Sequence, residues 1–346
     1  MLNEYGKRLP TLKEYSSLLI PFSALKDNEI INNIGALTTG KENEFYLVQT
    51  SDYTYRMMPG PEFSPRLYRG QNKHHSPCKP SLFRGTCNYE DYVYWNLKYV
   101  ELSKLLFYHP AVRDILSWDI DGLEFGTDFQ AIAQHYEYPT QMLDLTRSFD
   151  VAMFFATHEF DAINKSYKPT LGETAVLYVI DIAKLMQSLP VNCQLVPVGL
   201  DPLPRSAAQR AFGIKLDMND DFENVPGVYF ETFVVTEDIP SFYSNKFNNI
   251  YEIFPNDAFE DHIYFLKSNQ TITKKTIEYA EELGVIPFNY SIKYIENLLS
   301  KSGYCISDRN IDLPSIHTIN KAQEEWDLRR DNFIHKIKWR GVASSA

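Results

Sequence analysis

The sequence predicts an α+β fold in which a central mixed β-sheet lies between helical segments at the two ends of the chain. Apolar residues at helical spacing mark residues 1–40 and the region from Ala258 onward, while most β-type segments lie between them. The 346 residues are 44% hydrophobic and 23% charged, an ordinary globular composition for a chain long enough to bury a large core. No Gly/Ser linker divides the sequence, so we expect one elaborated domain.

The N-terminal half is predicted to combine helices with a few strands. Residues 1–40 carry short helical patterns, and FYLVQ, YTYRM and RLYRG predict strands. The segment LFRG, residues 82–85, predicts a second strand end with the same Arg-Gly closure. From Tyr89 to Leu116 the pattern is helical and breaks at Pro110, because proline lacks an amide donor and disfavours helical geometry just before it.

The second half is predicted to change from helix to sheet. DFQAIAQHY (128–136) predicts a helix, EYPTQMLDLTR predicts an irregular turn, and SFDVAMFFATHEF predicts a buried helix that starts near Ser148, a residue type that caps helices. Four further segments predict strands: TAVLYVID, FGIKL, VYFETFVV and YEIF. Helical spacing returns from Ala258 onward.

Charge and motif content exclude several classes of function. A formal net charge of −11 gives no bulk attraction to nucleic-acid phosphates or anionic membranes, so general binding to either is not expected. The sequence has no GxGxxG, GxxxxGK[ST] or GxSxG, which disfavours a Rossmann cofactor, a P-loop NTPase and a nucleophile-elbow hydrolase. His74 and His75 have no Cys or acidic residue at metal spacing, so no metal is expected.

The expected location is the cytoplasm. The segment MLNEYGKRLPTLKEY lacks the apolar core of a secretory signal, and no window approaches the ~20 apolar residues that a membrane span requires. The cysteines form no CxxC pair, so we expect free, reduced thiols at Cys78, Cys87, Cys193 and Cys305.

Polar residues gather in three blocks: LYRGQ at residues 67–71, QHYEYPTQMLDLT at residues 134–146, and RSAAQRAFGI at residues 205–214. With the apolar run VAMFFATHEF that follows the second block, they resemble the blocks of FRG-domain proteins, which are named for a (Phe/Tyr)-Arg-Gly motif. The middle block is the most specific, because these residues sit at the family spacings: Gln134, His135, Thr140, Leu143, Asp144 and Thr146.

The resemblance implies three regions. Residues 1–60 would form an N-terminal helical and strand elaboration, residues 61–256 the FRG domain, and residues 257–346 a helical C-terminal region packed on that domain.

The aromatic-Arg-Gly strand also resembles the opening strand of mono-ADP-ribosyltransferases, whose arginine contacts the phosphate and ribose region of NAD. The resemblance implies a central sheet with an ADP-ribosyltransferase-like fold, NAD as co-substrate and no metal. It implies catalytic roles for Arg69, His135 and Asp144. The implied NAD-binding residues are Tyr68, Arg69, Gly70, Gln134, Thr140, Thr146, Arg205 and Gln209.

The chemistry of these side chains agrees with an anionic nucleotide. Arg69 offers a planar fork of donors that suits phosphate oxygens, and Gly70 lets a flat ring approach the main chain. His135 changes charge near neutral pH, and Asp144 would orient His135 or an arginine. The hydroxyl groups of Thr140 and Thr146 would donate to ribose or amide oxygens.

Two departures from the related families bear on this hypothesis. In the third block, Arg210-Ala211-Phe212 stands where the FRG family has a glycine before the aromatic residue, and the added methyl group would crowd a ligand at that backbone. ADP-ribosyltransferases also carry a glutamate on a late strand, which no motif here matches. The candidates for that carboxylate are Glu231, Glu237 and Asp144.

Structural roles compete with these functional ones. Arg69 would equally form a buried salt bridge with Asp144, and His135 would brace the turn before Pro139. Thr140 and Thr146 are of the type that stabilises turns and helix starts. Outside the blocks, Arg84-Gly85 is interpreted as a turn or strand end, and His74-His75 as a solvated loop.

Three hypotheses about function follow. The first, which the resemblance implies, is an NAD-using ADP-ribosyltransferase, a toxin or phage-defence effector from bacteria, which would transfer ADP-ribose to an unknown macromolecule and would have a regulatory protein partner. The alternative is a non-catalytic module that senses a nucleotide or binds proteins. A nuclease ranks last, because the blocks lack the clustered carboxylates that hold two metal ions.

Overall fold

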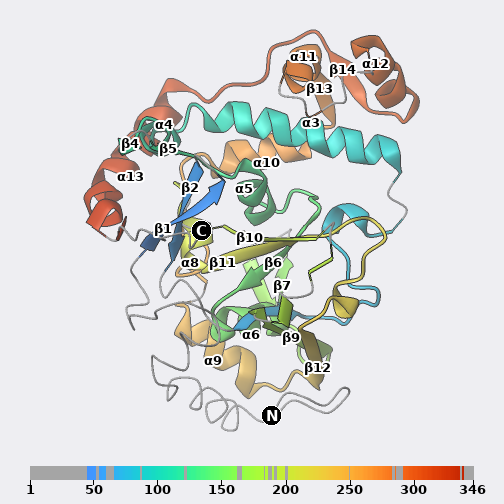
Figure 1. Ribbon diagram of the computed structural model, residues 1–346, viewed down its shortest axis with the longest axis vertical. Coiled ribbons are helices and arrows are strands. Elements are labelled where there is room, and N and C mark those ends of the chain that lie inside the picture. Colours follow the sequence, from blue (N-terminus) through green and yellow to red (C-terminus); the bar gives the residue numbers. More distant parts are fainter. Residues whose placement is uncertain are drawn as a thin grey trace, which may run out of the picture.

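The computed structural model describes residues 45–51, 54–59, 66–85, 88–120, 123–161, 166–182, 184–185, 189–190, 193–198, 202–248, 250–282, 285, 291–335 and 337–338. The helices predicted within residues 1–40 lie outside the described residues. The rest of the chain combines helices and strands, as the sequence predicts (Figure 1).

A six-stranded sheet lies at the centre of the molecule (Figure 1). Every neighbouring pair of its strands is antiparallel, so the prediction of a mixed central sheet is wrong for this sheet. A five-stranded sheet does mix parallel and antiparallel pairs. Its strands, in spatial order, are β15 (Ile337–Lys338), β1 (Phe45–Ser51), β2 (Thr54–Pro59), β5 (Leu123–Phe125) and β4 (Asp119–Ile120). The strands of the central sheet, in spatial order, are β10 (Gln194–Pro197), β11 (Ala211–Lys215), β6 (Met142–Thr146), β3 (Arg66–Gln71), β9 (Thr174–Asp181) and β12 (Val228–Val234).

The sheet opens between β3 and β6. Strand β3 pairs with β9 along its whole length, from Arg66 opposite Asp181 to Gln71 opposite Val176. It pairs with β6 only where Tyr68 lies opposite Thr146. Beyond this pair the two strands diverge, and the divergence places the end of β3 beside a gap in the sheet.

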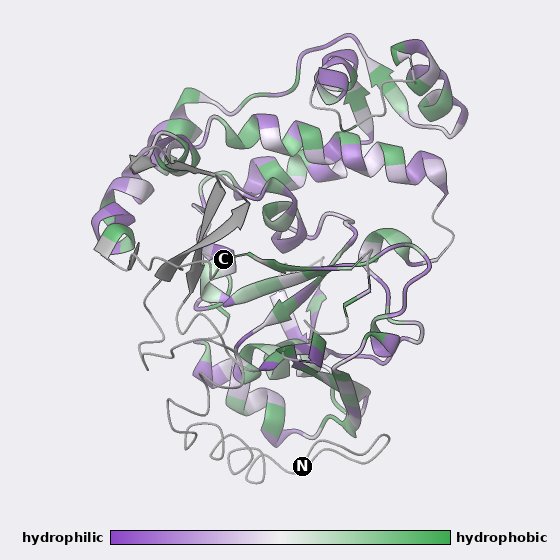
Figure 2. Ribbon diagram, viewed as in Figure 1, coloured by the Kyte–Doolittle hydropathy of each residue, from purple (hydrophilic) through white to green (hydrophobic). Residues whose placement is uncertain are grey.

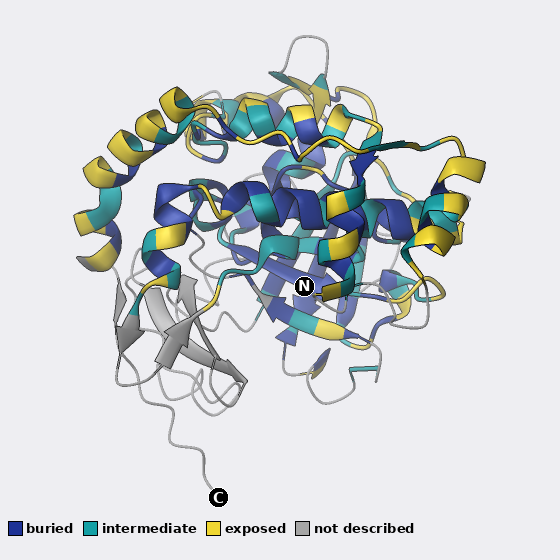
Figure 3. Cartoon of the chain, turned by 90° about the horizontal axis from the view of Figure 1, so that it is seen from above, coloured by how far each residue is buried: buried dark blue, intermediate teal, exposed yellow. Residues whose placement is uncertain are grey.

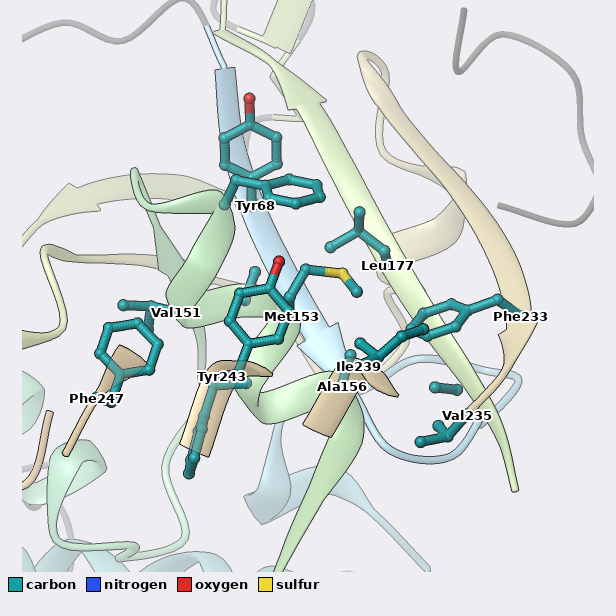
Figure 4. Close-up of a cluster of buried hydrophobic side chains, with 14 of the residues drawn as sticks. Tyr68, Val151, Met153, Ala156, Leu177, Phe233, Val235, Ile239, Tyr243 and Phe247 are labelled. Atoms are coloured by element: carbon teal, nitrogen blue, oxygen red, sulfur yellow. The ribbon is translucent and has the colours of Figure 1, made fainter. Parts of the chain in front are cut away.

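Helix α6 (Phe149–Thr157) covers one face of the sheet. The Ser148 hydroxyl accepts from the amide of Val151 at 3.3 Å, which confirms the predicted N-cap. The close-up in Figure 4 shows α6 and α9 (Asp238–Lys246) enclosing an apolar cluster with β3 and β9. The helix ends earlier than predicted, because His158–Asp161 forms β7 and pairs with β8 (Ser166–Pro169).

The opposite face of the sheet is covered by loops and short turns rather than by long helices. Leu67, Tyr178 and Ile214 are fully buried there against Phe222, which lies in the 3-10 helix η2 (Phe222–Asn224). A second 3-10 helix, η1 (Ser81–Phe83), occupies the segment predicted as a strand end.

A layer of helices lies over the sheet on the α5 side (Figure 1). Between α3 and α4 the chain breaks at Pro110, as predicted, and His109 caps α4 by accepting the amide of Ala111 at 3.2 Å. The helices of this layer and of the C-terminal region are α3 (Tyr89–Leu106), α4 (Pro110–Leu116), α5 (Phe129–His135), α8 (Pro204–Ala208), α10 (Glu260–Ser268), α11 (Lys274–Glu282), α12 (Ile292–Lys301) and α13 (Ile316–His335). Apolar and polar residues alternate along them (Figure 2), and burial concentrates on their inner faces and in the sheet (Figure 3).

An ion pair is buried where α3 meets the C-terminal region. The ammonium of Lys98 lies 2.9 Å from Oε2 of Glu101 and donates to the carbonyl of Thr271 at 3.1 Å. The other carboxylate oxygen, Oε1, accepts from the amide of Thr273 at 3.3 Å and from the hydroxyl of Thr276 at 3.1 Å. These bonds join α3 to β13 (Thr271–Thr273) and α11, and β13 pairs with β14 (Cys305–Ser307).

Two other predicted segments differ from the structure. Residues 142–146, predicted as an irregular turn, form the central strand β6. Residues 251–254, predicted as a strand, form a turn, because the amides of Ile253 and Phe254 bond back to the carbonyl of Ile250 at 3.0 and 2.9 Å.

Cys78, Cys193 and Cys305 are free thiols, as predicted, and Cys87 lies outside the described residues. Among the helices that the structure describes, none has the length and apolar character needed to cross a bilayer.

Candidate functional site

Arg69 lies near the end of β3, beside the gap in the sheet. Its Nη1 donates to the main-chain carbonyl of Asp144 at 2.8 Å, while its Nε is buried with no hydrogen-bond partner among the described residues. Because Tyr68 lies opposite Thr146, the Asp144 side chain stands on the Tyr68 face of the sheet and the Arg69 side chain on the other face. The salt bridge considered between the side chains of Arg69 and Asp144 is therefore replaced by a bond from the guanidinium to the Asp144 main-chain carbonyl.

Asp144 belongs to a network of side chains that the second block predicted. Oδ2 of Asp144 accepts from Nε2 of Gln134 at 3.0 Å, and the Thr140 hydroxyl donates to Oε1 of Gln134. The same hydroxyl accepts from the amide of Met142 at 3.2 Å. The network thus ties the end of α5 to the start of β6.

His135, Thr146 and Gln209 form a buried group next to this network. Nδ1 of His135 lies 3.0 Å from Oε1 of Gln209, and Nε2 of Gln209 donates to the carbonyl of Ile253 at 3.1 Å. The Thr146 hydroxyl donates to the carbonyl of Gln209 at 2.6 Å. Since the Gln209 oxygen only accepts, the His135 proton lies on Nδ1, and Nε2 is left buried without a partner among the described residues.

Burial lowers the pKa of His135 from the ordinary value of 6.5, and the charge of Arg205 acts in the same direction; Asp144 and the bond to Gln209 oppose this effect. In the unfolded chain the ring binds a proton as the pH falls below about 6.5. The unfolded state then holds more protons than the folded state, so the free energy of unfolding decreases from about pH 6.5 downward, toward the folded pKa.

We predict that urea midpoints measured between pH 7.5 and 5.5 fall more steeply for the wild type than for His135→Gln. His158 and His75, whose pKa values burial also lowers, account for the slope that remains. Equal slopes in the two proteins would contradict a buried, neutral His135.

Arg205 makes most of its contacts inside the protein. Nη1 donates to the carbonyl of His135 at 3.3 Å and to the hydroxyl of Tyr264 at 3.1 Å, and Nη2 pairs with Glu260. The guanidinium also stacks over the ring of Tyr136, 4.3 Å from its centroid. The side chain therefore holds α5 and α10 together around the third block.

Packing explains the residue types at three positions near the site: Tyr68, Gly70 and Ala211. Tyr68 is 7% exposed and meets Phe149 edge-on at 5.6 Å, inside the cluster under α6. A Cβ on Gly70 would lie 1.7 Å from the carbonyl oxygen of Ala152, so the glycine lets α6 approach β3. The Ala211 methyl group is buried in an apolar cluster with Ala131 and Met142.

A pocket of about 620 Å³ opens on the Arg69 face of the sheet. The loop after β3 and the end of η1 form its walls, so the segments interpreted as a solvated loop and a turn enclose a cavity. A high density of cations in an acidic chain, from Arg69 to Arg84, was the signal for it in the sequence. The lining residues are Gln71, His74, His75, Ser76, Pro77, Lys79, Phe83, Arg84 and Gly85.

Positive charges crowd this pocket. Burial lowers the pKa of Arg84, and the charge of Arg69 lowers it further. Burial also lowers the pKa of His75, followed by the charges of Arg84, Lys73, His74 and Arg69. These effects place Arg69 within electrostatic range of the pocket, where an anion would relieve the repulsion.

The second block holds one wall of the pocket in place. The amide of Thr140 donates to the Ser81 hydroxyl at 3.2 Å, and the amide of Leu82 donates to the carbonyl of Thr140 at 3.2 Å. Helix η1, which precedes Arg84, is therefore attached to the residue that also bonds Gln134.

The carboxylate candidates lie at different places. Glu231 lies opposite Leu177 on the α6 face of the sheet and is 5% exposed, so it points away from the pocket. Glu237 immediately precedes α9, and its side chain makes no capping hydrogen bond there. Glu223, which sequence reasoning missed, accepts from the pocket residue His74: its Oε1 lies 2.7 Å from Nε2 of that ring.

The described residues contain no group of three or more His, Cys, Asp or Glu side chains arranged to hold a metal ion. Comparisons with curated proteins and with solved structures found no match for this chain. A comparison with protein families, in contrast, matches residues 64–165, which include Arg69 and the whole second block, to the FRG domain. The chain therefore contains an FRG domain in residues 64–165.

Proposed function

We propose that this protein binds NAD in the basic pocket beside Arg69 and transfers its ADP-ribose to a macromolecule. The pocket is large enough for a nucleotide, since ligand sites commonly enclose about 300–1,000 Å³. Such an activity would suit a toxin or phage-defence effector in the bacterial cytoplasm, held in check by a protein partner.

The observation that carries the proposal is the state of the Arg69 guanidinium. One of its nitrogens is fixed on the carbonyl of Asp144, and its buried Nε lacks a partner among the described residues. A guanidinium fixed on one side in this way offers its remaining N–H donors to an anion at little entropic cost. Arg84 and Lys79 line the pocket and add the further positive charge that a pyrophosphate requires.

Transfer of ADP-ribose passes through an oxocarbenium-like centre at C1′ of the nicotinamide ribose. Cleavage of the bond to nicotinamide sends its electron pair to the leaving ring, and a carboxylate stabilises the positive charge that develops. Glu223, which accepts from the pocket residue His74, is the carboxylate that the hydrogen bonds place at the proposed site.

The second candidate function is nucleotide sensing without turnover. Two observations favour it: His135 is buried, and the Asp144 carboxylate is bonded to Gln134. Both residues were predicted to be catalytic, and neither side chain is free to act on a ligand. In this case the nucleotide would stabilise the protein without being consumed.

We expect purified protein to be stabilised by NAD in a thermal shift experiment and to release nicotinamide, measured by chromatography. Arg69→Ala should weaken NAD binding by about 10- to 100-fold, because a hydrogen bond to a charged group contributes about 1.5–3 kcal/mol. The NAD affinity of Arg69→Lys should lie between those of the wild type and Arg69→Ala, because lysine keeps the charge but lacks the planar fork of donors.

Arg309→Ala, which changes an exposed arginine in the turn after β14, is the matched control and should bind NAD as the wild type does. Stabilisation by NAD without nicotinamide release would favour sensing. Unchanged affinity in Arg69→Ala would refute the proposed site.

A further inference from the structure

His74 is a pocket residue whose orientation is fixed by a hydrogen bond. Its Nε2 lies 2.7 Å from Oε1 of Glu223, and the same oxygen accepts from the hydroxyl of Tyr178 at 2.8 Å. The side chains of His74 and Glu223 are 32% and 10% exposed, so the imidazole reaches the pocket while the carboxylate stands behind it. The ring also rests against Phe230, with 5.2 Å between ring centroids.

The two loops that carry this pair are fastened together. Oδ1 of Asp221 accepts from the amide of Cys78 at 2.9 Å, and the amide of Phe222 donates to the carbonyl of Cys78 at 3.0 Å. Lys79 adds a bond from its ammonium to the carbonyl of Met218 at 2.7 Å. The geometry of the pair is therefore set before any ligand binds, as a reactive group requires.

The bond to Glu223 decides which nitrogen of His74 faces outward. A carboxylate at Nε2 holds the ring proton there and leaves the lone pair on Nδ1. Nδ1 of His74 has no hydrogen-bond partner in the part of the chain that the structure describes. A neutral imidazole held this way is suited to accept a proton from a group that enters the pocket.

We infer that His74 is the proton acceptor for the incoming nucleophile, with Glu223 and Tyr178 as its positioning residues. The inference rests on the proposed function and adds a residue that none of the three blocks contains. The nucleophile of the acceptor, an N–H or O–H group, bonds to C1′ as the bond to nicotinamide breaks. Its proton passes to Nδ1 of His74 and from there to water, and nicotinamide leaves with the electron pair.

The surrounding charges are consistent with this role. On its own loop and the facing wall, His74 is near Lys73, His75, Lys79 and Arg84, and Arg69 lies at the end of β3. These positively charged side chains are placed to hold the phosphates of the donor beside the acceptor.

The test uses the full chain with NAD and an acceptor preparation in which the wild type shows turnover. His74→Ala should lower kcat by about 100-fold or more, as loss of a general base does, and leave the Kd for NAD nearly unchanged. Added imidazole should restore part of the rate. Glu223→Gln should lower kcat by about 10- to 100-fold, as loss of a group that orients a histidine does, without rescue by imidazole.

His262→Ala, a histidine on α10 bonded to the carbonyl of Asp312, is the control and should retain the wild-type rate. A wild-type rate in both His74→Ala and Glu223→Gln, with Arg69→Ala inactive, would overturn this inference and leave the proposed function standing. Absence of nicotinamide release and of NAD binding in the wild type would refute the proposed function, and the role of His74 with it.

Discussion

Gly70→Ala is expected to destabilise the protein by about 3 kcal/mol or more, the upper end of what overpacking costs. The new Cβ would lie 1.7 Å from the carbonyl oxygen of Ala152 and 2.8 Å from the amide nitrogen of Ala156. Both atoms belong to the backbone of α6, which no side-chain rotation can move aside. The helix would have to shift away from β3, and the apolar cluster between them would lose its packing.

The measurement is a urea unfolding curve of the variant. Gly303→Ala is the matched control, because Gly303 has a φ of +84° and nothing lies within 4 Å of its added Cβ. That variant carries only the strain of a left-handed residue, about 1–2 kcal/mol. A Gly70→Ala protein as stable as the control would show that α6 does not need this close contact.

Lys98→Met is expected to lower the free energy of unfolding by about 3–5 kcal/mol, because it leaves the Glu101 carboxylate buried without its counter-charge. The side chains of the pair are 0% and 3% exposed, so water cannot replace the lost ammonium. The bonds from Thr273 and Thr276 remain, but neither carries a charge.

The double variant Lys98→Met with Glu101→Met should regain part of this loss, since apolar residues of similar volume often replace a buried ion pair without penalty. Lys168→Met breaks an exposed pair with Glu159 and serves as the control; its urea midpoint should match the wild type. Lys98→Met with a wild-type midpoint would mean that Glu101 is protonated or hydrated in the folded protein.

Local sequence patterns were sufficient to predict the features that depend only on residues close together in the sequence. The cap at Ser148 and the break at Pro110 are properties of single residues and their immediate neighbours. Strand β6 was missed because Asp144 and Thr146 resemble turn residues, although Leu143 and Leu145, which alternate with them, are buried in the sheet. Its partners β3 and β11 are distant in sequence, and only tertiary pairing makes the strand.

The candidate site, like the fold, was predicted only where its residues lie in one local block of sequence. The second block predicted that Gln134, Thr140 and Asp144 would lie together near Arg69, and the hydrogen bonds bring them together. The pocket was not predicted, because its walls come from loops whose conformations depend on distant partners. Nothing in the sequence relates Glu223 to His74, which are separated by 149 positions.

This separation has a consequence for the newly made chain. During synthesis the N-terminal part leaves the ribosome first, at about 5–20 residues per second. His74, Arg69 and Arg84 therefore exist for several seconds before Glu223 emerges and the loops that carry His74 and Glu223 can fasten to each other. A protein with toxic chemistry would be harmless throughout translation of its first two hundred residues, which gives a partner time to bind.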